Sequence, residues 1–312
     1  MNTEDINSYV EEQLKRWPLA RENFFRLGES LRKPMQLGHL NCAVQLNPAR
    51  IVSTGAKTDS KSIAERPCFL CAANRPAEQL CVEWPARWEF LVNPYPILPI
   101  HFTIASRSHT PQASIPLDMV EMAENAPDLV FFFNGAHAGA SAPDHLHVQA
   151  VLKSELPLCR FTEEHHPASE PGFVDSAGFG GELPFRFVSA VITPDLTGMR
   201  NLLKIEGAFG IDAETGEKDI GLLNAFFWIG DDGYLRSIIV PRRRHRPGRY
   251  FQGGDSGFMV SPGAIDMAGL VITPRREDFN RITPEIVKEI YADVAFADSL
   301  PESVKNHFFL PN

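Results

Sequence analysis

The chain has 312 residues, which is enough for one large domain or two modest domains with cores of their own. Hydrophobic residues make up 44% of it, as in a globular protein, and no run approaches the roughly 20 apolar residues of a membrane helix. A formal net charge of −9 argues against a broad nucleic-acid surface, although a local pocket can still bind a small anion. The acidic, polar start has no apolar signal region, so we expect a cytoplasmic protein that binds neither membranes nor nucleic acids.

The first half of the chain predicts helices followed by strands. The first 30 residues have a helical pattern with a break near Pro18, and residues 40–66 begin as a short strand and continue as a polar loop. Further strands are expected at 88–92, 101–105, 129–133 and 145–152, with a short helix at 115–125. In the strand at 145–152, three polar residues alternate with apolar ones, so His145, His147 and Gln149 share one face.

The second half predicts a loop, more strands and a final helix. Residues 155–182 have the composition of a loop, with His165 and His166 at the surface, and we expect the boundary between two halves there. Strands are predicted at 185–192, 223–230, 234–240 and 270–273. Thr283 as N-cap, followed by Pro284 and Glu285, opens the final helix. The mixture indicates an α+β protein dominated by antiparallel sheet.

The segment from Asn134 to Gln149 carries the strongest chemical signal. A buried strand leads into a loop of small residues, whose backbone amides suit phosphate oxygens. The strand that follows presents two imidazoles and an amide on one face. A neutral histidine can attack phosphorus, and Gln149 can donate to an oxygen that gains charge in the transition state. A pair of histidines spaced in this way is also found in plain metal sites and on polar strand faces.

Cys68 and Cys71 form a Cys-x-x-Cys pair, the spacing that presents two thiolates to a tetrahedral zinc ion. His109 and His145 are the candidates to complete the site. A redox pair is the alternative, although no thioredoxin-like pattern surrounds the cysteines, and two buried, inert cysteines are the third interpretation. The odd total of five cysteines argues against a disulfide framework.

With Cys-x-x-Cys, a later Ser-x-x-His and the final His-x-His-x-Gln, the chain resembles the histidine-triad superfamily in its galactose-1-phosphate uridylyltransferase branch. The form HLHVQ is most similar to the GDP-hexose phosphorylases, and Leu146 departs from the uridylyltransferases, which carry proline there. The likeness covers residues 40–155. It implies an α+β fold with a duplicated histidine-triad-like antiparallel sheet, built as half-barrels with flanking helices. Residues 1–160 would be the catalytic half, and residues 161–312 a degenerate half that contributes to the substrate pocket.

The resemblance also implies roles for single residues. His147 matches the nucleophile that becomes nucleotidylated, and Gln149 matches the residue that contacts the transferred phosphate. Positions that match substrate contacts are Asn93, Asn134, Gly139 and Ser141. The set that matches a structural zinc site is Cys68, Cys71, His109 and His145. Asn93 precedes Pro94, so capping a turn is an equally good interpretation. The second metal cluster of the uridylyltransferases has no counterpart here, so we expect at most one metal.

Three features of the remaining sequence leave alternatives open. The segment PRRRHRP at 241–247 offers Arg243 and Arg244 to a phosphate or sugar phosphate, or it is a solvated basic loop. Asp266 contacts a sugar hydroxyl or caps a turn. His101 faces the pocket or is a buried structural imidazole.

These patterns predict a nucleotidyltransferase or phosphorylase that works through a nucleotidyl-histidine on His147. The HLHVQ form favours a nucleoside diphosphate sugar as substrate, GDP-hexose in particular, with phosphate or a sugar 1-phosphate as the second substrate. The closest alternative is a diadenosine polyphosphate phosphorylase. Others are a nucleotide hydrolase, disfavoured by Gln149 in place of a third histidine, a non-catalytic nucleotide- or zinc-binding protein, and a redox or metallochaperone protein. Several relatives are dimers, so a homodimer is expected.

Overall fold

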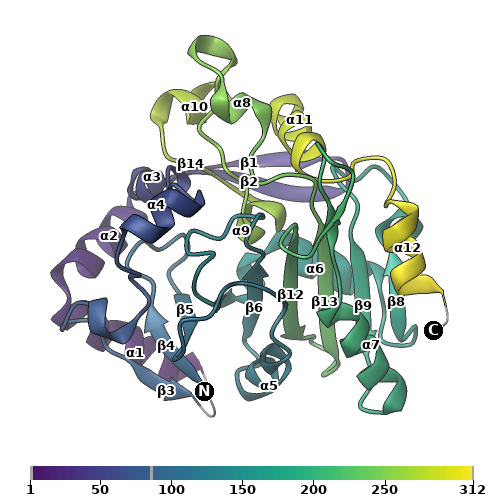
Figure 1. Cartoon of the computed structure of the whole chain (residues 1–312), viewed down its shortest axis with the longest axis horizontal. Helices are drawn as coiled ribbons and strands as arrows, with labels where there is room; N and C mark the ends of the chain where they lie inside the picture. The colour runs from purple at the N-terminus through teal and green to yellow at the C-terminus, as the bar shows by residue number, and fades with distance from the viewer. Residues whose placement is uncertain (1–2, 85–86, 311–312) are drawn as a thin grey trace.

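A nine-stranded antiparallel sheet crosses the molecule (Figure 1). The structure is a computed structural model that describes residues 3–84 and 87–310. From one edge to the other, the strands are β3 (Val82–Trp84), β4 (Trp88–Val92), β5 (His101–Ser106), β7 (His147–Leu152), β6 (Leu129–Asn134), β12 (Leu223–Ile229), β13 (Leu235–Pro241), β9 (Val188–Ile192) and β8 (Gly172–Asp175).

The connectivity of this sheet repeats once. In the first half the chain runs through β4, β5, helix α5 (Asp118–Asn125), β6 and β7, and in the second through β8, β9, helix α7 (Leu196–Glu206), β12 and β13. The corresponding strands β6 and β12 pair at the centre, with Phe132 opposite Phe226. The two halves therefore share one continuous sheet. The boundary near residue 160 stays a prediction.

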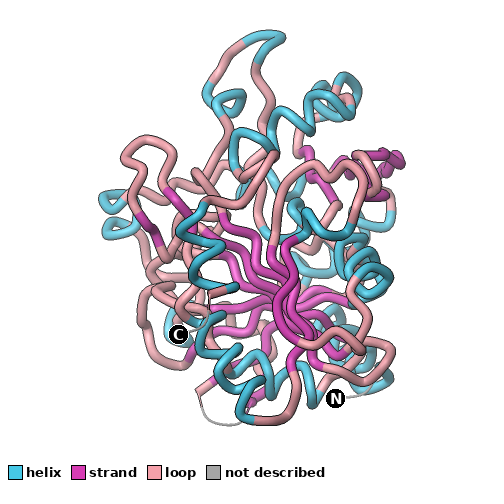
Figure 2. Tube along the Cα trace, turned by 90° about the vertical axis from the view of Figure 1, so that its right-hand side faces the viewer, coloured by secondary structure: helices cyan, strands magenta, loops and turns pink. Residues whose placement is uncertain are grey.

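A smaller sheet and several helices cover one face of the large sheet. The small sheet contains β1 (Leu31–Leu37), β2 (Leu40–Leu46) and β14 (Leu270–Thr273), and β14 from the second half pairs in parallel with β2 from the first. The helices that pack into the same core are α6 (Pro157–His165), α9 (Ala264–Met267), α10 (Arg276–Arg281) and α11 (Pro284–Val294). Figure 2 shows the strands of the large sheet crossing the molecule between these segments and the helices of the opposite face.

The opposite face of the large sheet packs against α1 (Thr3–Arg16), α5, α7 and α12 (Glu302–Phe309). The remaining elements are short or lie at the rim. They are α2 (Pro18–Gly28), α3 (Ile51–Thr54), α4 (Ser60–Glu65), α8 (Gly248–Phe251), the pair β10 (Gly210–Ile211) and β11 (Lys218–Asp219), and 3₁₀ turns that include η1 (Pro48–Arg50). None of the helices in the described ranges is long and apolar enough to cross a membrane.

The structure confirms the α+β class, the dominant antiparallel sheet and the flanking helices. It also confirms the helical start, which breaks between Arg16 and Pro18, and the presence of the predicted strands of both halves. The strands predicted at 145–152 and 185–192 begin at His147 and Val188, so His145 precedes its strand, and the loop predicted to end at residue 66 contains α3 and α4. In α11, which the sequence predicted as the final helix, the hydroxyl of Thr283 accepts the N–H of Ile286 as an N-cap, but α12 follows it.

The prediction of a loop at 155–182 is wrong, because the segment contains α6 and β8. Arg160 and Glu164 of α6 are exposed, whereas Leu158 and Phe161 are buried in the core. His166, expected at the surface, is fully buried, and its ring nitrogens lie 2.7 Å from Ser189 Oγ and 2.8 Å from a backbone carbonyl.

Candidate active site

His147 opens strand β7 with its ring held in one tautomer. Val148 and Ala150 pack into the core on one face of the sheet, so His147 and Gln149 point to the other face. The ring nitrogen Nδ1 lies 2.8 Å from the backbone carbonyl oxygen of His145. A carbonyl only accepts, so Nδ1 carries the proton and Nε2 keeps a free lone pair.

The protonation state of His147 suits nucleophilic attack. Burial lowers the pKa of the imidazole to about 4, more than the carbonyl of His145 raises it, so the ring is neutral at neutral pH. A neutral imidazole with an unprotonated Nε2 is the form that can attack phosphorus.

Gln149 is oriented by a chain of hydrogen bonds that begins at the backbone. The N–H of Ile97 donates to Nδ1 of His101 at 3.1 Å, which leaves the ring proton on Nε2. That proton points to Oε1 of Gln149 at 2.8 Å. The carbonyl end of Gln149 is therefore occupied, and its NH₂ end is free to donate. His101 is fully buried, and it contributes to the site by orienting Gln149.

Gln112 fixes the backbone at the start of β7, a role that the sequence did not indicate. Its Oε1 accepts the N–H of His147 at 2.9 Å, and its Nε2 donates to the carbonyls of His147 and Asn134 at 2.8 and 2.9 Å. The side chain is buried and bridges the two strands that frame the small-residue loop. A lone glutamine in a loop carries no local sequence signal that separates it from a surface residue.

His147 lines a cavity of about 680 Å³, a size typical of small-molecule sites. Its walls are largely apolar and include Leu91, and Asn93 lies among them. Asn93 donates to Thr103 Oγ1 at 3.0 Å and accepts the N–H of Tyr95 at 2.9 Å, so it caps a turn while it lines the cavity. The turn-capping interpretation of Asn93 is confirmed, and its contact with substrate stays a prediction.

A smaller polar cavity of about 60 Å³ adjoins the first, and Ser141 and Gln149 line both. Asn134 and Gly139 also line it. Gly139 has φ +100, and a Cβ there would lie 2.6 Å from the Cα of Gly263, so glycine is required. Within the described residues, no protein acceptor takes the amide N–H groups of residues 139–141. The loop thus offers free backbone donors to an anion.

Two arginines from opposite halves of the chain line the polar cavity. Arg50 ends η1, and burial lowers its pKa to about 10, which leaves it cationic. Arg246 comes from the second half and donates to the carbonyls of Thr54 and Ala56 at 3.0 and 2.7 Å. The sequence did not single out Arg50, and it indicated Arg246 only as part of the segment 241–247, because the packing of the two halves is what brings the two residues together.

The predicted arginines of the same segment lie elsewhere. Arg243 donates to the carbonyl of Ala292 at 3.3 Å, and Arg244 lies 3.2 Å from the carboxylate of Asp293. Neither lines the two cavities that contain Gln149. Arg246 of the same segment lines the polar cavity instead, and a contact of Arg243 or Arg244 with substrate stays a prediction.

Asp266 lies at the wall of the polar cavity and caps a turn. Its carboxylate accepts the N–H groups of Gly263 and Ile272 at 3.0 and 2.8 Å, as the turn-capping interpretation expected. Burial raises the pKa of this carboxyl to about 6, although the two N–H donors and Arg50 favour its ionised form.

We expect Asp266 to make the folded protein less stable as the pH rises. Because its folded pKa lies above the usual value, its contribution is fully present below about pH 4 and is lost as the pH passes through about 6. A shift of this size corresponds to about 3 kcal/mol. Denaturant unfolding of wild type and Asp266→Asn from pH 4 to 7 checks this. A stability difference between them that does not change with pH contradicts it.

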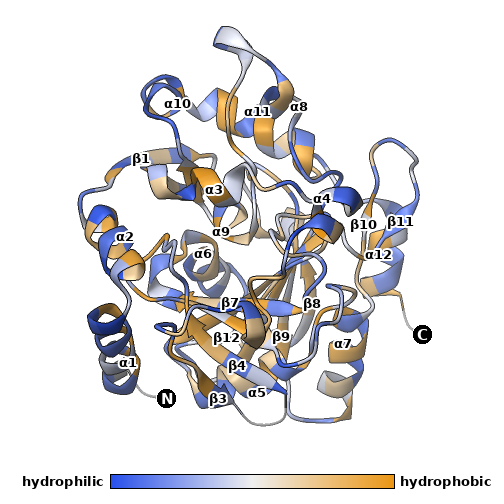
Figure 3. Cartoon of the chain, turned by 60° about the vertical axis from the view of Figure 1, so that its left-hand side comes forward, coloured by the Kyte–Doolittle hydropathy of each residue, from blue (hydrophilic) through white to orange (hydrophobic). Residues whose placement is uncertain are grey.

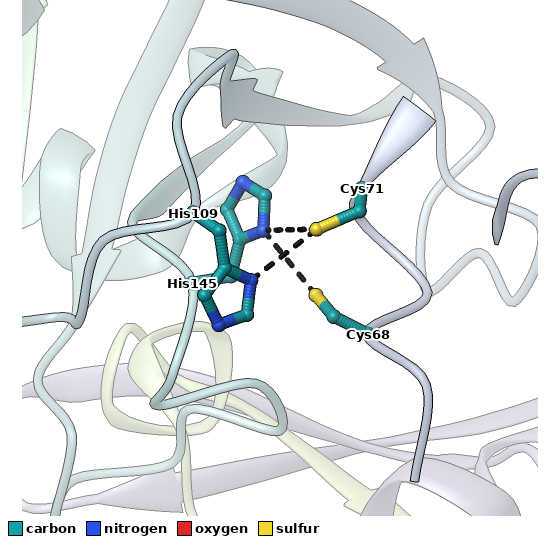
Figure 4. Close-up of side chains that lie close together, drawn as sticks. All are labelled: Cys68, Cys71, His109 and His145. Atoms are coloured by element: carbon teal, nitrogen blue, oxygen red, sulfur yellow. Dashed lines mark hydrogen bonds between the residues drawn. The ribbon is translucent and has the colours of Figure 1, made fainter. Parts of the chain in front are cut away.

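Cys68, Cys71, His109 and His145 converge beside the active-site strand (Figure 4). Their ligand atoms all lie within 4.8 Å of one another. Nδ1 of His145 lies 3.2 Å from the sulfur of Cys68 and 3.5 Å from that of Cys71, and Nδ1 of His109 lies 3.2 Å from the sulfur of Cys71. Zinc–ligand bonds of about 2.0–2.3 Å in a tetrahedron separate sulfur and nitrogen by about 3.5 Å. The residues fit one zinc ion.

The surroundings of His145 support the same assignment. Its Nε2 lies 2.7 Å from the carbonyl oxygen of Ser106, which fixes the proton on Nε2 and leaves Nδ1 as the ligand atom. The carbonyl of His145 is also the acceptor that fixes the tautomer of His147. A metal bound to Nδ1 of His145 would thus be linked to the candidate nucleophile through one residue, His145, whose carbonyl accepts the hydrogen bond of His147.

Comparisons with known proteins found a family model that matches the first half of the chain and solved structures with the same fold. A family model described as "Domain of unknown function (DUF4922)" matches residues 9–152, the segment that contains the Cys/His cluster and His147. No curated protein sequence matches the chain.

Solved structures of yeast Ap4A phosphorylase Apa2 resemble the whole chain. The complex with Ap4A has a TM-score of 0.59 at 14% identity over 96% of this chain and 100% of that chain. The complex with AMP has a TM-score of 0.56 at 14% identity over 93% and 98%. A further crystal structure has a TM-score of 0.56 at 15% identity over 91% and 98%. The chain therefore has the fold of yeast Ap4A phosphorylase Apa2.

Proposed function

We propose that the protein is a nucleotidyltransferase that acts as a phosphorylase on dinucleoside polyphosphates. The observation that carries the proposal is His147, neutral, with Nε2 free in a cavity of nucleotide size and the NH₂ group of Gln149 beside it. The polar cavity next to both residues supplies cationic and amide donors for further phosphate groups.

The comparisons favour this substrate over the nucleoside diphosphate sugar that the HLHVQ form suggested. The yeast enzyme with the same fold was crystallised with Ap4A and with AMP. A GDP-hexose has no corresponding support. The homodimer, the cytoplasmic location and the sugar 1-phosphate acceptor stay predictions.

The first chemical step transfers the nucleotide to the enzyme. Nε2 of His147 attacks the α-phosphorus in line, the bond from that phosphorus to the bridging oxygen breaks, and the nucleoside polyphosphate leaves with the electron pair. The NH₂ group of Gln149 donates to the phosphoryl oxygen that gains charge. The carbonyl of His145 holds the proton on Nδ1 and stabilises the cationic imidazole.

The second step returns the nucleotide to an acceptor. An oxygen of inorganic phosphate attacks the same phosphorus, the Nε2–P bond breaks, and Nε2 regains its lone pair. Arg50, Arg246 and the free amides of residues 139–141 would hold this phosphate in the polar cavity. Chemistry of this type depends on positioning and charge stabilisation.

Intact-protein mass spectrometry tests the proposal. The protein is incubated with a panel of dinucleoside polyphosphates and nucleoside diphosphate sugars. The expected result is a mass increase of one nucleoside monophosphate that added phosphate discharges much faster than water does. Discharge by water alone indicates the hydrolase. No adduct with any panel member, in folded and zinc-loaded protein, overturns the transferase.

Gln149→Ala is expected to slow adduct formation by about 10²-fold while the nucleotide Kd changes little, because the lost hydrogen bond forms mainly in the transition state. Quenched-flow mass spectrometry measures the rate. Gln36→Ala is the matched control, since that side chain is exposed and bonds only to the carbonyl of Gly38. Equal rates in Gln149→Ala and wild type contradict the role.

Arg246→Gln is expected to raise the KM for phosphate about tenfold or more, because a charge-assisted hydrogen bond contributes about 1.5–3 kcal/mol. Adduct formation should change less. Arg244→Gln is the control, since its guanidinium pairs with Asp293 outside the cavities. The KM is measured from phosphate saturation curves at a fixed nucleotide concentration. If Arg246→Gln and Arg244→Gln have the same KM for phosphate, Arg246 does not bind the phosphate.

A further inference from the structure

A second apolar cavity adjoins the one that contains His147. Its volume is about 470 Å³, and its walls come from α2, η1, α3 and the ends of β1 and β2. Leu19, Val52 and Tyr95 line both cavities, so the two share one wall. Figure 3 shows α2 and α3 on the same side of the molecule as β1. None of the chemistry described above uses this second cavity.

The apolar side chains of this cavity are unusually exposed for their type. Leu31, Ile51 and Val52 are 45%, 46% and 59% exposed. Exposed apolar side chains that gather around one hollow mark a binding site more often than chance placement. The hollow accepts a flat hydrophobic group that is at least partly withdrawn from water.

Polar groups around the same cavity define what kind of group fits. Asn23 and Asn47, about 5% and 4% exposed, each donate the side-chain NH₂ to a backbone carbonyl at 2.9 Å. Their side-chain carbonyl oxygens accept no hydrogen bond from a described residue, so they remain as acceptors at the cavity wall. Arg276 lines the cavity, is exposed, and has no ion-pair partner in the described part of the chain.

The lining also includes Arg26, which pairs with Glu22, and the side chain of Glu29. Apolar walls, the two carbonyl acceptors and the unpaired Arg276 match a nucleobase with an amino group, followed by phosphate. Arg50 lies at the boundary with the His147 cavity, since its guanidinium donates to the carbonyl of Tyr95 at 2.9 Å. The guanidinium of Arg50 therefore lies where a polyphosphate chain would pass from one cavity to the other.

We propose that this cavity binds the second nucleoside of a dinucleoside polyphosphate, the end that departs with the leaving group. The inference rests on the proposed function and assigns a place to the part of the substrate that is not transferred. The first nucleoside occupies the larger cavity with its α-phosphate at Nε2 of His147, and the phosphate chain passes Arg50 and the wall that Val52 and Tyr95 share.

Calorimetric binding to the His147→Ala protein tests the site without turnover. The ligands are diadenosine tetraphosphate and adenosine tetraphosphate, which differ only in the second nucleoside. We expect the dinucleotide to bind at least about tenfold tighter. Ala49→Trp, which fills the cavity, should abolish this difference without changing the Kd of the mononucleotide, and Ile51→Ala should reduce it severalfold.

Leu203→Ala is the control for Ile51→Ala, because it trims an exposed apolar side chain on α7. Equal affinity for the two ligands, or an equal change in both caused by Ala49→Trp, overturns the proposal. A dimer that Ala49→Trp dissociates, with nucleotide affinities unchanged, makes the cavity an interface between copies and also overturns it. Adduct formation by unmodified protein distinguishes failure of the second nucleoside site from failure of the proposed phosphorylase activity. If Ala49→Trp weakens dinucleotide binding but unmodified protein forms no adduct, the second nucleoside site is supported and the phosphorylase activity is contradicted.

Discussion

His147→Ala is expected to form no nucleotidyl adduct and to lose phosphorolysis by at least about 10³-fold, as removal of a covalent nucleophile does in other enzymes. The physical reason is specific to Nε2, the only ring nitrogen of His147 with a free lone pair. Among the described residues, no other imidazole lines the cavity that contains His147, and the next ring, that of His245, lines the adjoining polar cavity.

The measurement combines intact mass with steady-state phosphorolysis. His165→Ala is the matched control, since that ring lies on α6, outside the cavities, with Nδ1 2.8 Å from the carbonyl of Phe161. The control should retain the adduct. An adduct that persists in His147→Ala would place the nucleophile on another residue and would leave the role of β7 as phosphate binding alone.

The strand that carries His147 and Gln149 could be predicted because its signal is local. His147 and Gln149 alternate with Val148 and Ala150, and period 2 is all that a strand needs to put two polar groups on one face. The convergence of Cys68 and Cys71 with two distant histidines needed more than spacing. It was expected from a resemblance, and the packing of the loop at Cys68 against His145 brings the four residues together.

The polar cavity could not be predicted in the same way. Arg50 and Arg246 are separated by almost two hundred residues, and neither lies in a repeating pattern. The packing of the two halves, which are tied together by the pairing of β12 with β6 and of β14 with β2, places them around one space. Helix α7 was not predicted, although the side chain of Asp195 caps it by accepting the N–H of Gly198.

Loss of the Cys/His cluster is expected to affect both stability and catalysis. Cys68→Ser removes one thiolate from a site whose four ligands fit a tetrahedral zinc ion, so bound zinc should fall from one per chain toward zero. A structural zinc ion contributes several kcal/mol to folding, and each kcal/mol shifts the Tm of a domain of this size by about 2–4 °C. A fall in Tm of roughly 10 °C or more follows.

Catalysis should fall with it, because a metal bound to the ring of His145 would hold this residue in place, and the carbonyl of His145 fixes the tautomer of His147. Cys81→Ser is the control, since Cys81 is exposed and outside the cluster. Elemental analysis, thermal unfolding and the rate of adduct formation are measured on the same preparations. If wild type binds no zinc and its Cys68 and Cys71 react freely with thiol reagents, the cluster is a redox pair. If Cys68→Ser loses zinc but keeps the wild-type Tm and adduct rate, the metal neither stabilises the fold nor holds β7 in place, and the orientation of His147 must come from Gln112 and the sheet alone.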